Sequence, residues 1–192
     1  MEYFENEKIE NLQYSDETLE GAEYCDCKFY NCQFTNVKMR NCSFTDCEFF
    51  NCAFRNVKFE FSTMKNSSFT ESLLMGINWN ELQGKGAISF PVESFKNCMI
   101  KYNNFVESNL LSFDFSGSNI SDTNFQDCLL MKACFKNVPF KDTNFTKCNL
   151  SYCDFRGAND YGIDINNNTL TRAKFSFPTV VCLLNSINID IE

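Results

Sequence analysis

Apolar residues recur at every fifth position along most of this chain. From Phe4 to Trp79 all 16 positions of this series are apolar, which chance would give about two times in a million at the overall apolar content of 44%. The series fails at Gly84, resumes one residue out of phase at Phe90 and runs to Phe175, broken only at Asp160. A period of five fits neither an α-helix nor a flat strand. The pattern therefore predicts a backbone that brings every fifth residue inward.

Two further columns accompany the apolar one. The position two residues before each apolar centre is small, as a second and tighter interior position requires; it begins Ala22, Cys27, Cys32, Val37, Cys42, Cys47. The position two residues after the centre is mostly Asn or Asp in the first half, for example Asp26 and Asn31. Asn and Asp favour corners because their side chains bond nearby backbone and tolerate unusual dihedral angles. Each five-residue unit is thus predicted to be a short extended piece followed by a corner.

These units resemble the pentapeptide-repeat family, whose consensus is Ala-(Asp/Asn)-Leu-x-x. Two that show the resemblance are Cys32-Gln33-Phe34-Thr35-Asn36 and Cys153-Asp154-Phe155-Arg156-Gly157. The resemblance implies an all-β fold: a right-handed, quadrilateral parallel β-helix with 20 residues per coil, here ending in a short C-terminal helix and strand. Phe replaces Leu at most centres, and Cys often replaces Ala. The expected interior includes Phe29, Phe34, Phe44, Phe54, Phe125, Phe145, Cys32, Cys52, Cys128 and Cys148.

One continuous domain is expected, divided into five segments. They are an acidic N-terminal segment and cap (1–21), a first repeat block (22–79), an interrupting loop (80–92), a second repeat block (93–175) and a C-terminal helix/strand cap (176–192). The repeats give about six coils, and at ~4.8 Å per stacked strand a rod of roughly 29 Å.

The segment 80–92 leaves two interpretations open. It carries two Gly and a Pro, and the register slips by one residue across it. It is either a protruding recognition loop held by a rigid scaffold, or a passive kink capped by the single Trp. The candidate partner-binding residues of the loop are Trp79, Glu81, Gln83, Lys85 and Ser89.

The C-terminal segment predicts a helix of about two turns that begins at Pro178, followed by an alternating strand from Ile187. This ending, together with Gly76-Ile77-Asn78-Trp79, resembles the branch of the family that includes the immunity protein against a gyrase-directed microcin and, more distantly, the Qnr quinolone-resistance proteins. In Qnr-type relatives this helix forms a symmetric dimer. The resemblance implies a homodimer with Val181, Leu184 and Ile187 as contacts; the alternative is that they only plug the last coil.

Composition excludes much chemistry. The chain has 12 Cys but no His, so an imidazole base and a His-ligated metal are both excluded, and no Cys-x-x-Cys occurs. We expect no enzyme, no cofactor and no metal. Nine Cys lie on the small interior column, which indicates reduced core thiols in a cytoplasmic protein. We find no apolar run long enough to span a membrane and no signal-peptide pattern.

The net charge of −8 is concentrated at one end. Residues 1–26 hold nine acids and one base, whereas residues 27–192 sum to zero. Such a protein does not bind nucleic acid through its phosphates, but it can compete with nucleic acid for a basic protein surface; the simpler reading is that the acids keep it soluble. Two functions follow: a DNA mimic that binds type II topoisomerase (DNA gyrase or topoisomerase IV) and protects it from quinolones or a microcin, or a structural adaptor rod with another protein partner.

Overall fold

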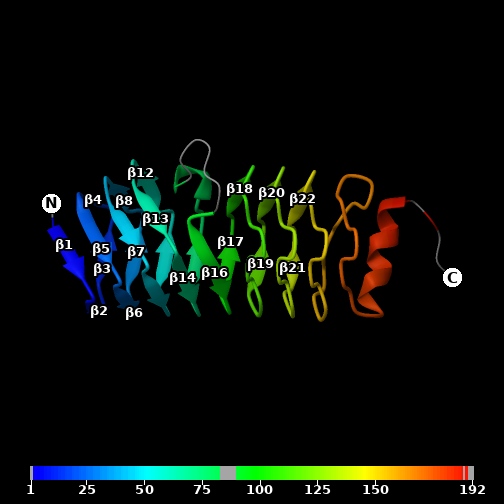
Figure 1. Ribbon diagram of the computed structural model, residues 1–192, viewed down its shortest axis with the longest axis horizontal. Helices are drawn as coiled ribbons and strands as arrows, with labels where there is room; N and C mark the ends of the chain where they lie inside the picture. The colour runs from blue at the N-terminus through cyan, green and yellow to red at the C-terminus, as the bar shows by residue number, and fades with distance from the viewer. Residues whose placement is uncertain (1, 83–89, 188, 190–192) are drawn as a thin grey trace.

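The computed structural model describes residues 2–82, 90–187 and 189, and these form a rod (Figure 1). The chain winds as a right-handed quadrilateral β-helix in which every paired strand is parallel. The N-terminal strand and the C-terminal helix lie at opposite ends of the rod (Figure 1). No helix among the described residues is long and apolar enough to cross a membrane.

The strands stack into five sheets on four faces. Face 1 holds β1 (Glu2–Glu5), β5 (Ala22–Cys25), β9 (Ser43–Thr45) and β13 (Thr63–Lys65). Face 2 holds β2 (Lys8–Glu10), β6 (Lys28–Tyr30), β10 (Glu48–Phe50), β14 (Ser67–Thr70) and β16 (Val92–Lys96). Face 3 holds β3 (Gln13–Ser15), β7 (Gln33–Thr35), β11 (Ala53–Arg55), β15 (Leu73–Met75), β17 (Met99–Lys101), β19 (Asn119–Ser121) and β21 (Phe140–Lys141). Face 4 holds β4 (Thr18–Glu20), β8 (Lys38–Arg40) and β12 (Lys58–Glu60), then a short 3-10 helix η1 (Trp79–Leu82), then β18 (Asn104–Val106), β20 (Asn124–Gln126) and β22 (Asn144–Thr146). A second 3-10 helix, η2 (Thr179–Ile187), covers the last coil (Figure 1).

The register of the stacked strands advances by 20 residues per coil. Phe4 pairs with Tyr24, which in turn pairs with Phe44. The ten expected interior Phe and Cys residues are all buried, with at most 4% of each exposed. The repeat of five thus becomes a core because each coil has four sides of five residues, and the same position on every side faces the axis.

The β-helix begins one coil earlier than expected. Strands β1 to β4 form a complete coil, so residues 2–20 are the first turn of the rod and not a separate segment in front of it. Face 3 alone stacks seven strands, which makes the rod longer than the six coils expected. The expected start of the β-helix was wrong because large residues occupy the small interior column in this coil: Glu2, Glu7, Leu12 and Glu17.

The corners and the small column are both held by hydrogen bonds. Corner residues two after each centre adopt left-handed backbone angles, and the Asn and Asp among them also bond in ladders, as when the Asn51 amide donates to Asn31 (2.7 Å). The small interior residues also form hydrogen bonds between coils. Ser72 Oγ donates to the carbonyl of Phe49 in the previous coil (3.4 Å), and Cys52 Sγ donates to that of Phe29 (3.5 Å). Ser, Thr and Cys suit this column because they are small and carry a donor that can bond to a buried carbonyl of the previous coil.

Aromatic rings form continuous stacks inside the rod. Phe125 lies parallel to Phe105 and Phe145 at centroid distances of 4.8 and 4.9 Å. All 12 thiols are free, and the stacked cysteines are not joined by disulfides. One slip occurs near the end: where Asp160 breaks the apolar series, the neighbouring Tyr161 is buried in its place.

Candidate functional site

The interruption between the two repeat blocks inserts six residues into one coil. Phe69 pairs with Phe95 and Leu74 pairs with Ile100, a step of 26 residues instead of 20. Faces 2 and 3 run through the interruption, with a bulge between Ser67 and Ser68. Faces 1 and 4 are broken there. The one-residue shift of the apolar series therefore arises from an insertion of six residues, which is one five-residue unit and one further residue.

Trp79 packs in the core at the interruption and connects the coils on either side of it. Its indole is fully buried and stacks between Phe59 and Phe105, at centroid distances of 6.3 and 6.2 Å. Its Nε1–H donates to Oδ1 of Asn103 (2.9 Å), and Asn103 Nδ2 donates to the carbonyls of Leu74 and Lys101. A buried indole N–H needs such a partner. Trp79 thus occupies the centre position of its coil and offers no surface to a partner, contrary to its expected place in a recognition loop.

Two side chains of η1 replace the missing strand of face 4. The Asn80 amide accepts from the backbone N–H of Val106 (3.0 Å) and donates to its carbonyl, as a neighbouring strand would. On the other side, Glu81 Oε2 accepts from the backbone N–H of Phe59 in β12 (2.8 Å). Glu81 therefore has a structural role, because its carboxylate bonds the backbone of β12. These roles were not visible in the sequence, because an amide and a carboxylate next to Gly-rich chain look like any polar loop.

The other three candidate loop residues, Gln83, Lys85 and Ser89, lie outside the described residues. Their assignment to a partner-binding loop stays a prediction.

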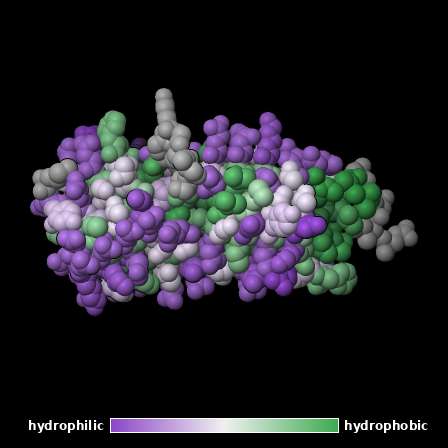
Figure 2. Space-filling model, viewed as in Figure 1, coloured by the Kyte–Doolittle hydropathy of each residue, from purple (hydrophilic) through white to green (hydrophobic). Residues whose placement is uncertain are grey.

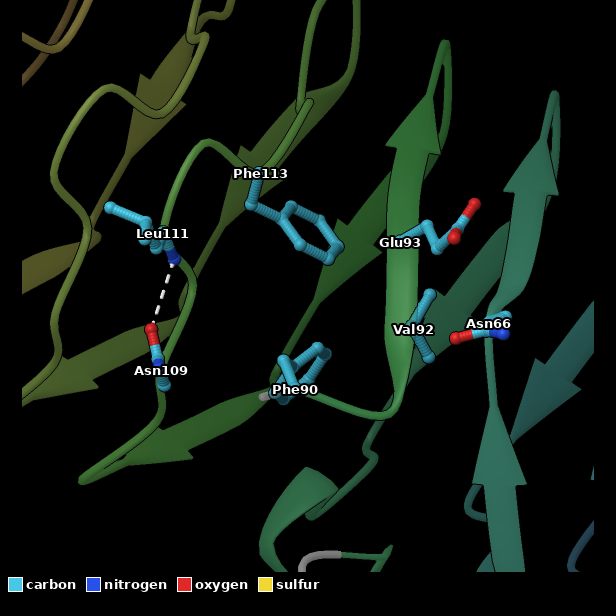
Figure 3. Close-up of a pocket in the computed structure, with 7 residues that line it drawn as sticks. All are labelled: Asn66, Phe90, Val92, Glu93, Asn109, Leu111 and Phe113. Carbon is cyan, nitrogen blue, oxygen red and sulfur yellow. Dashed lines mark hydrogen bonds between the residues drawn. The ribbon is translucent and has the colours of Figure 1, made fainter. Parts of the chain in front are cut away.

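A hollow of about 370 Å³ lies where face 1 resumes (Figure 3). Its lining is mixed, with polar and apolar side chains, and comprises Asn66, Phe90, Val92, Glu93, Asn109, Leu111 and Phe113. Asn109 Oδ1 accepts from the backbone N–H of Leu111 (3.3 Å), so part of its polar lining serves the local backbone. Glu93 is the one titratable side chain among these seven residues. A single carboxylate without an acid or base partner does not make a catalytic pair.

The C-terminal helix has one face on the rod and one turned away. Leu183 packs on the core, and Ser186 Oγ accepts from the backbone N–H of Ile165 (3.3 Å). In a 3-10 helix residues three apart eclipse one another, so Val181, Leu184 and Ile187 share a ridge next to the docked one. Hydrophobic residues gather at this end of the molecule (Figure 2). The helix expected after Pro178 is confirmed; of the strand expected after it, the structure describes only Ile187 and Ile189.

Acids and bases balance on the sides of the rod, and several of them form ion pairs. Ion pairs connect neighbouring coils: Lys28–Glu48 (3.3 Å), Arg40–Glu60 (2.8 Å), Lys96–Asp114 (3.3 Å), Lys101–Asp122 (3.7 Å) and Lys136–Asp154 (3.5 Å). The sides therefore present a mixed surface. The first coil differs, since its one base, Lys8, pairs with Glu10 (2.8 Å) and leaves the other acids in excess.

Burial keeps several of the interior thiols protonated. Burial raises the pKa of Cys47, Cys98 and Cys153 to about 12, which keeps them protonated at neutral pH. In the described part of the chain, no three His, Cys, Asp or Glu side chains are grouped to hold a metal ion.

Comparison with known sequence families identifies the repeat. The profile of the pentapeptide repeats matches eight copies in residues 27–66, 104–137 and 132–159, which is half of the chain. The chain belongs to the pentapeptide-repeat family. Proteins of this pentapeptide-repeat fold are generally structural or binding proteins.

Among solved structures of pentapeptide-repeat proteins, HetL shares the fold, and two others give lower TM-scores. HetL, involved in heterocyst differentiation regulation in Nostoc sp. strain PCC 7120, superposes with a TM-score of 0.58 at 12% identity over 88% of this chain and 85% of HetL. QnrB1, a plasmid-mediated fluoroquinolone resistance protein, gives 0.39 at 15% identity over 97% of this chain and 100% of its own. A pentapeptide-repeat protein of the Arabidopsis thaliana thylakoid lumen gives 0.30 at 15% identity over 70% of each chain. No curated protein sequence matches this one.

Proposed function

We propose that this pentapeptide-repeat protein is a non-enzymatic binding protein whose partner is a type II topoisomerase, DNA gyrase or topoisomerase IV. Bound to it, the rod would protect the enzyme from a quinolone or a microcin by occupying surface that DNA otherwise contacts. The observation that carries the proposal is a rigid rod whose net charge of −8 sits wholly in its first 26 residues. Negative charge held on a rigid scaffold is what a basic DNA-binding surface attracts. The resemblance of the Gly76–Trp79 stretch and of the C-terminal segment to the gyrase-related branch supports a type II topoisomerase as the partner.

A second candidate function, a structural adaptor rod with a different protein partner, is favoured by the paired charges on the sides. A phosphate mimic along the whole rod needs an acidic stripe, whereas residues 27–192 hold as many bases as acids, and some of them form ion pairs such as Arg40–Glu60. If mimicry operates, it operates through the first coil.

The proposal includes two further properties. A homodimer through η2 is supported by the ridge of Val181, Leu184 and Ile187, whose apolar side chains the rest of the described chain covers only in part. A cytoplasmic location is supported by 12 unpaired cysteines, which a reducing compartment maintains.

Gyrase supercoiling, titrated with ciprofloxacin in the presence and absence of the purified protein, tests the proposed function. Protection predicts that more drug is needed to halve supercoiling when the protein is present. A drug response unchanged at a tenfold molar excess over gyrase would favour the adaptor function.

A further inference from the structure

The N-terminal end of the rod is an apolar surface that no described residue covers. The first coil has four apolar centres that pack on the core but are only half-buried: Phe4, Ile9, Tyr14 and Leu19. The centres after Tyr24 are nearly all buried. Each centre of the first coil lies on a strand whose partner is in the second coil, so the outer edge of β1 to β4 has no neighbour in the described chain. Open strand edges around exposed apolar side chains make a surface suited to pairing with another protein.

Charge determines what this surface accepts. Residues 2–20 hold seven acids and one base, all exposed. Three of the acids, Glu2, Glu7 and Glu17, stand at the positions where the next coil buries Ala22, Cys27 and Val37. Carboxylates thus occupy three of the four small-column positions of the first coil, and Leu12 occupies the fourth. A second copy of this end would bring two equally negative surfaces together, which like-charge repulsion opposes.

We infer that the N-terminal end, and not a side of the rod, is the surface that engages the partner, and that it takes a positively charged protein surface with exposed apolar side chains. The sides are excluded as the source of net attraction because residues 27–192 hold equal numbers of acids and bases, several of which form ion pairs between neighbouring coils. At the end the carboxylates steer a basic partner, and the half-buried ring of Phe4, Ile9, Tyr14 and Leu19 provides apolar area to bury. This inference rests on the proposed function only in requiring a protein partner.

A cationic peptide without gyrase tests the inference separately. The probe is a capped octapeptide of alternating Lys and Leu, labelled with a fluorophore, and binding is read by anisotropy in 50 mM salt. Wild-type protein is expected to bind it. Glu7→Gln with Glu17→Gln should weaken binding about tenfold, since two charge contacts are lost.

The matched control removes the same charge from the sides. Glu107→Gln with Asp127→Asn changes two exposed corner acids of the second block, for which the structure shows no ion pair. Binding in this variant should stay within about twofold of wild type. Equal weakening in both variants, or no binding of the peptide by wild-type protein, overturns the inference.

A third variant separates the apolar contribution from charge. Leu12→Ser introduces a residue that other coils carry in the same small column, such as Ser72, so the coil is expected to fold. Binding should weaken several-fold with an unchanged dependence on salt. An unchanged affinity would overturn the apolar part, and concentration-dependent self-association lost in Leu12→Ser would show that a second copy is the occupant. If the peptide results hold but gyrase is not protected, the end surface stands and the topoisomerase proposal fails.

Discussion

Replacing Phe125 with Ala should reveal how much stability one interior ring contributes. Phe125 is fully buried and lies within a stack, parallel to Phe105 and Phe145 at 4.8 and 4.9 Å. Truncating a core Phe to Ala costs about 3–5 kcal/mol, and each stacked pair is worth about 0.5–1.5 kcal/mol beyond burial. Because both neighbours lose a partner, we expect a loss near the upper end, about 4–5 kcal/mol.

Urea unfolding, followed by circular dichroism and by the fluorescence of the single Trp, measures this loss. Phe61→Ala is the control, because Phe61 is 84% exposed at a corner and its removal should change stability by less than about 0.5 kcal/mol. Trp79 touches Phe105, so its fluorescence also reports whether damage at Phe125 spreads one coil along the rod. Stacked repeats depend on their neighbours, so we expect both probes to shift. A cost below about 1 kcal/mol for Phe125→Ala would refute the interior register.

Four further predictions concern other parts of the rod. Arg156 donates two hydrogen bonds to Asp154 and lowers the pKa of that carboxylate to about 2. The stabilisation from this pair is therefore present above pH 4 and lost as pH falls towards 2. Asp154→Asn should reduce the loss of melting temperature between pH 4 and pH 2 and cost about 1 kcal/mol at pH 7. Gly117 has a φ of +69° and faces the side chain of Asn97, so Gly117→Ala should cost about 1–2 kcal/mol in urea unfolding, and a neutral result would contradict the strain. Denatured without reductant, the protein should titrate close to 12 thiols, and six disulfides would overturn the reduced core. Light scattering should find a dimer that Leu184→Asp dissociates while the coil still melts cooperatively; a wild-type monomer at high micromolar concentration would reject the interface.

The period of five made the interior predictable from sequence. Once every fifth residue must face inward, the positions of Phe54 or Phe145 follow from counting, and no long-range contact has to be guessed. The first coil was missed by the same logic. Its centres keep the period from Phe4, but Glu7 and Glu17 break the small column, because both side chains are exposed to solvent where no described coil stacks on the first one.

The interruption could not be predicted at the same level. The side chains of Asn80 and Glu81 either are solvated or replace a missing strand. Which of the two occurs depends on where the six-residue insertion leaves the backbones of Val106 and Phe59. Sequence spacing carries no signal for such side chain-to-backbone bonds. On η2, Val181, Leu184 and Ile187 were expected as one set of contacts, and their spacing of three places them on one ridge because the helix is of the 3-10 type.

Hydrogen–deuterium exchange of the protein with and without bound gyrase tests the central claim most directly. Engagement through the negative end predicts slower exchange in residues 2–26 and unchanged exchange in the side strands β17 to β22. Protection spread along the sides, with residues 2–26 unaffected, would contradict the account.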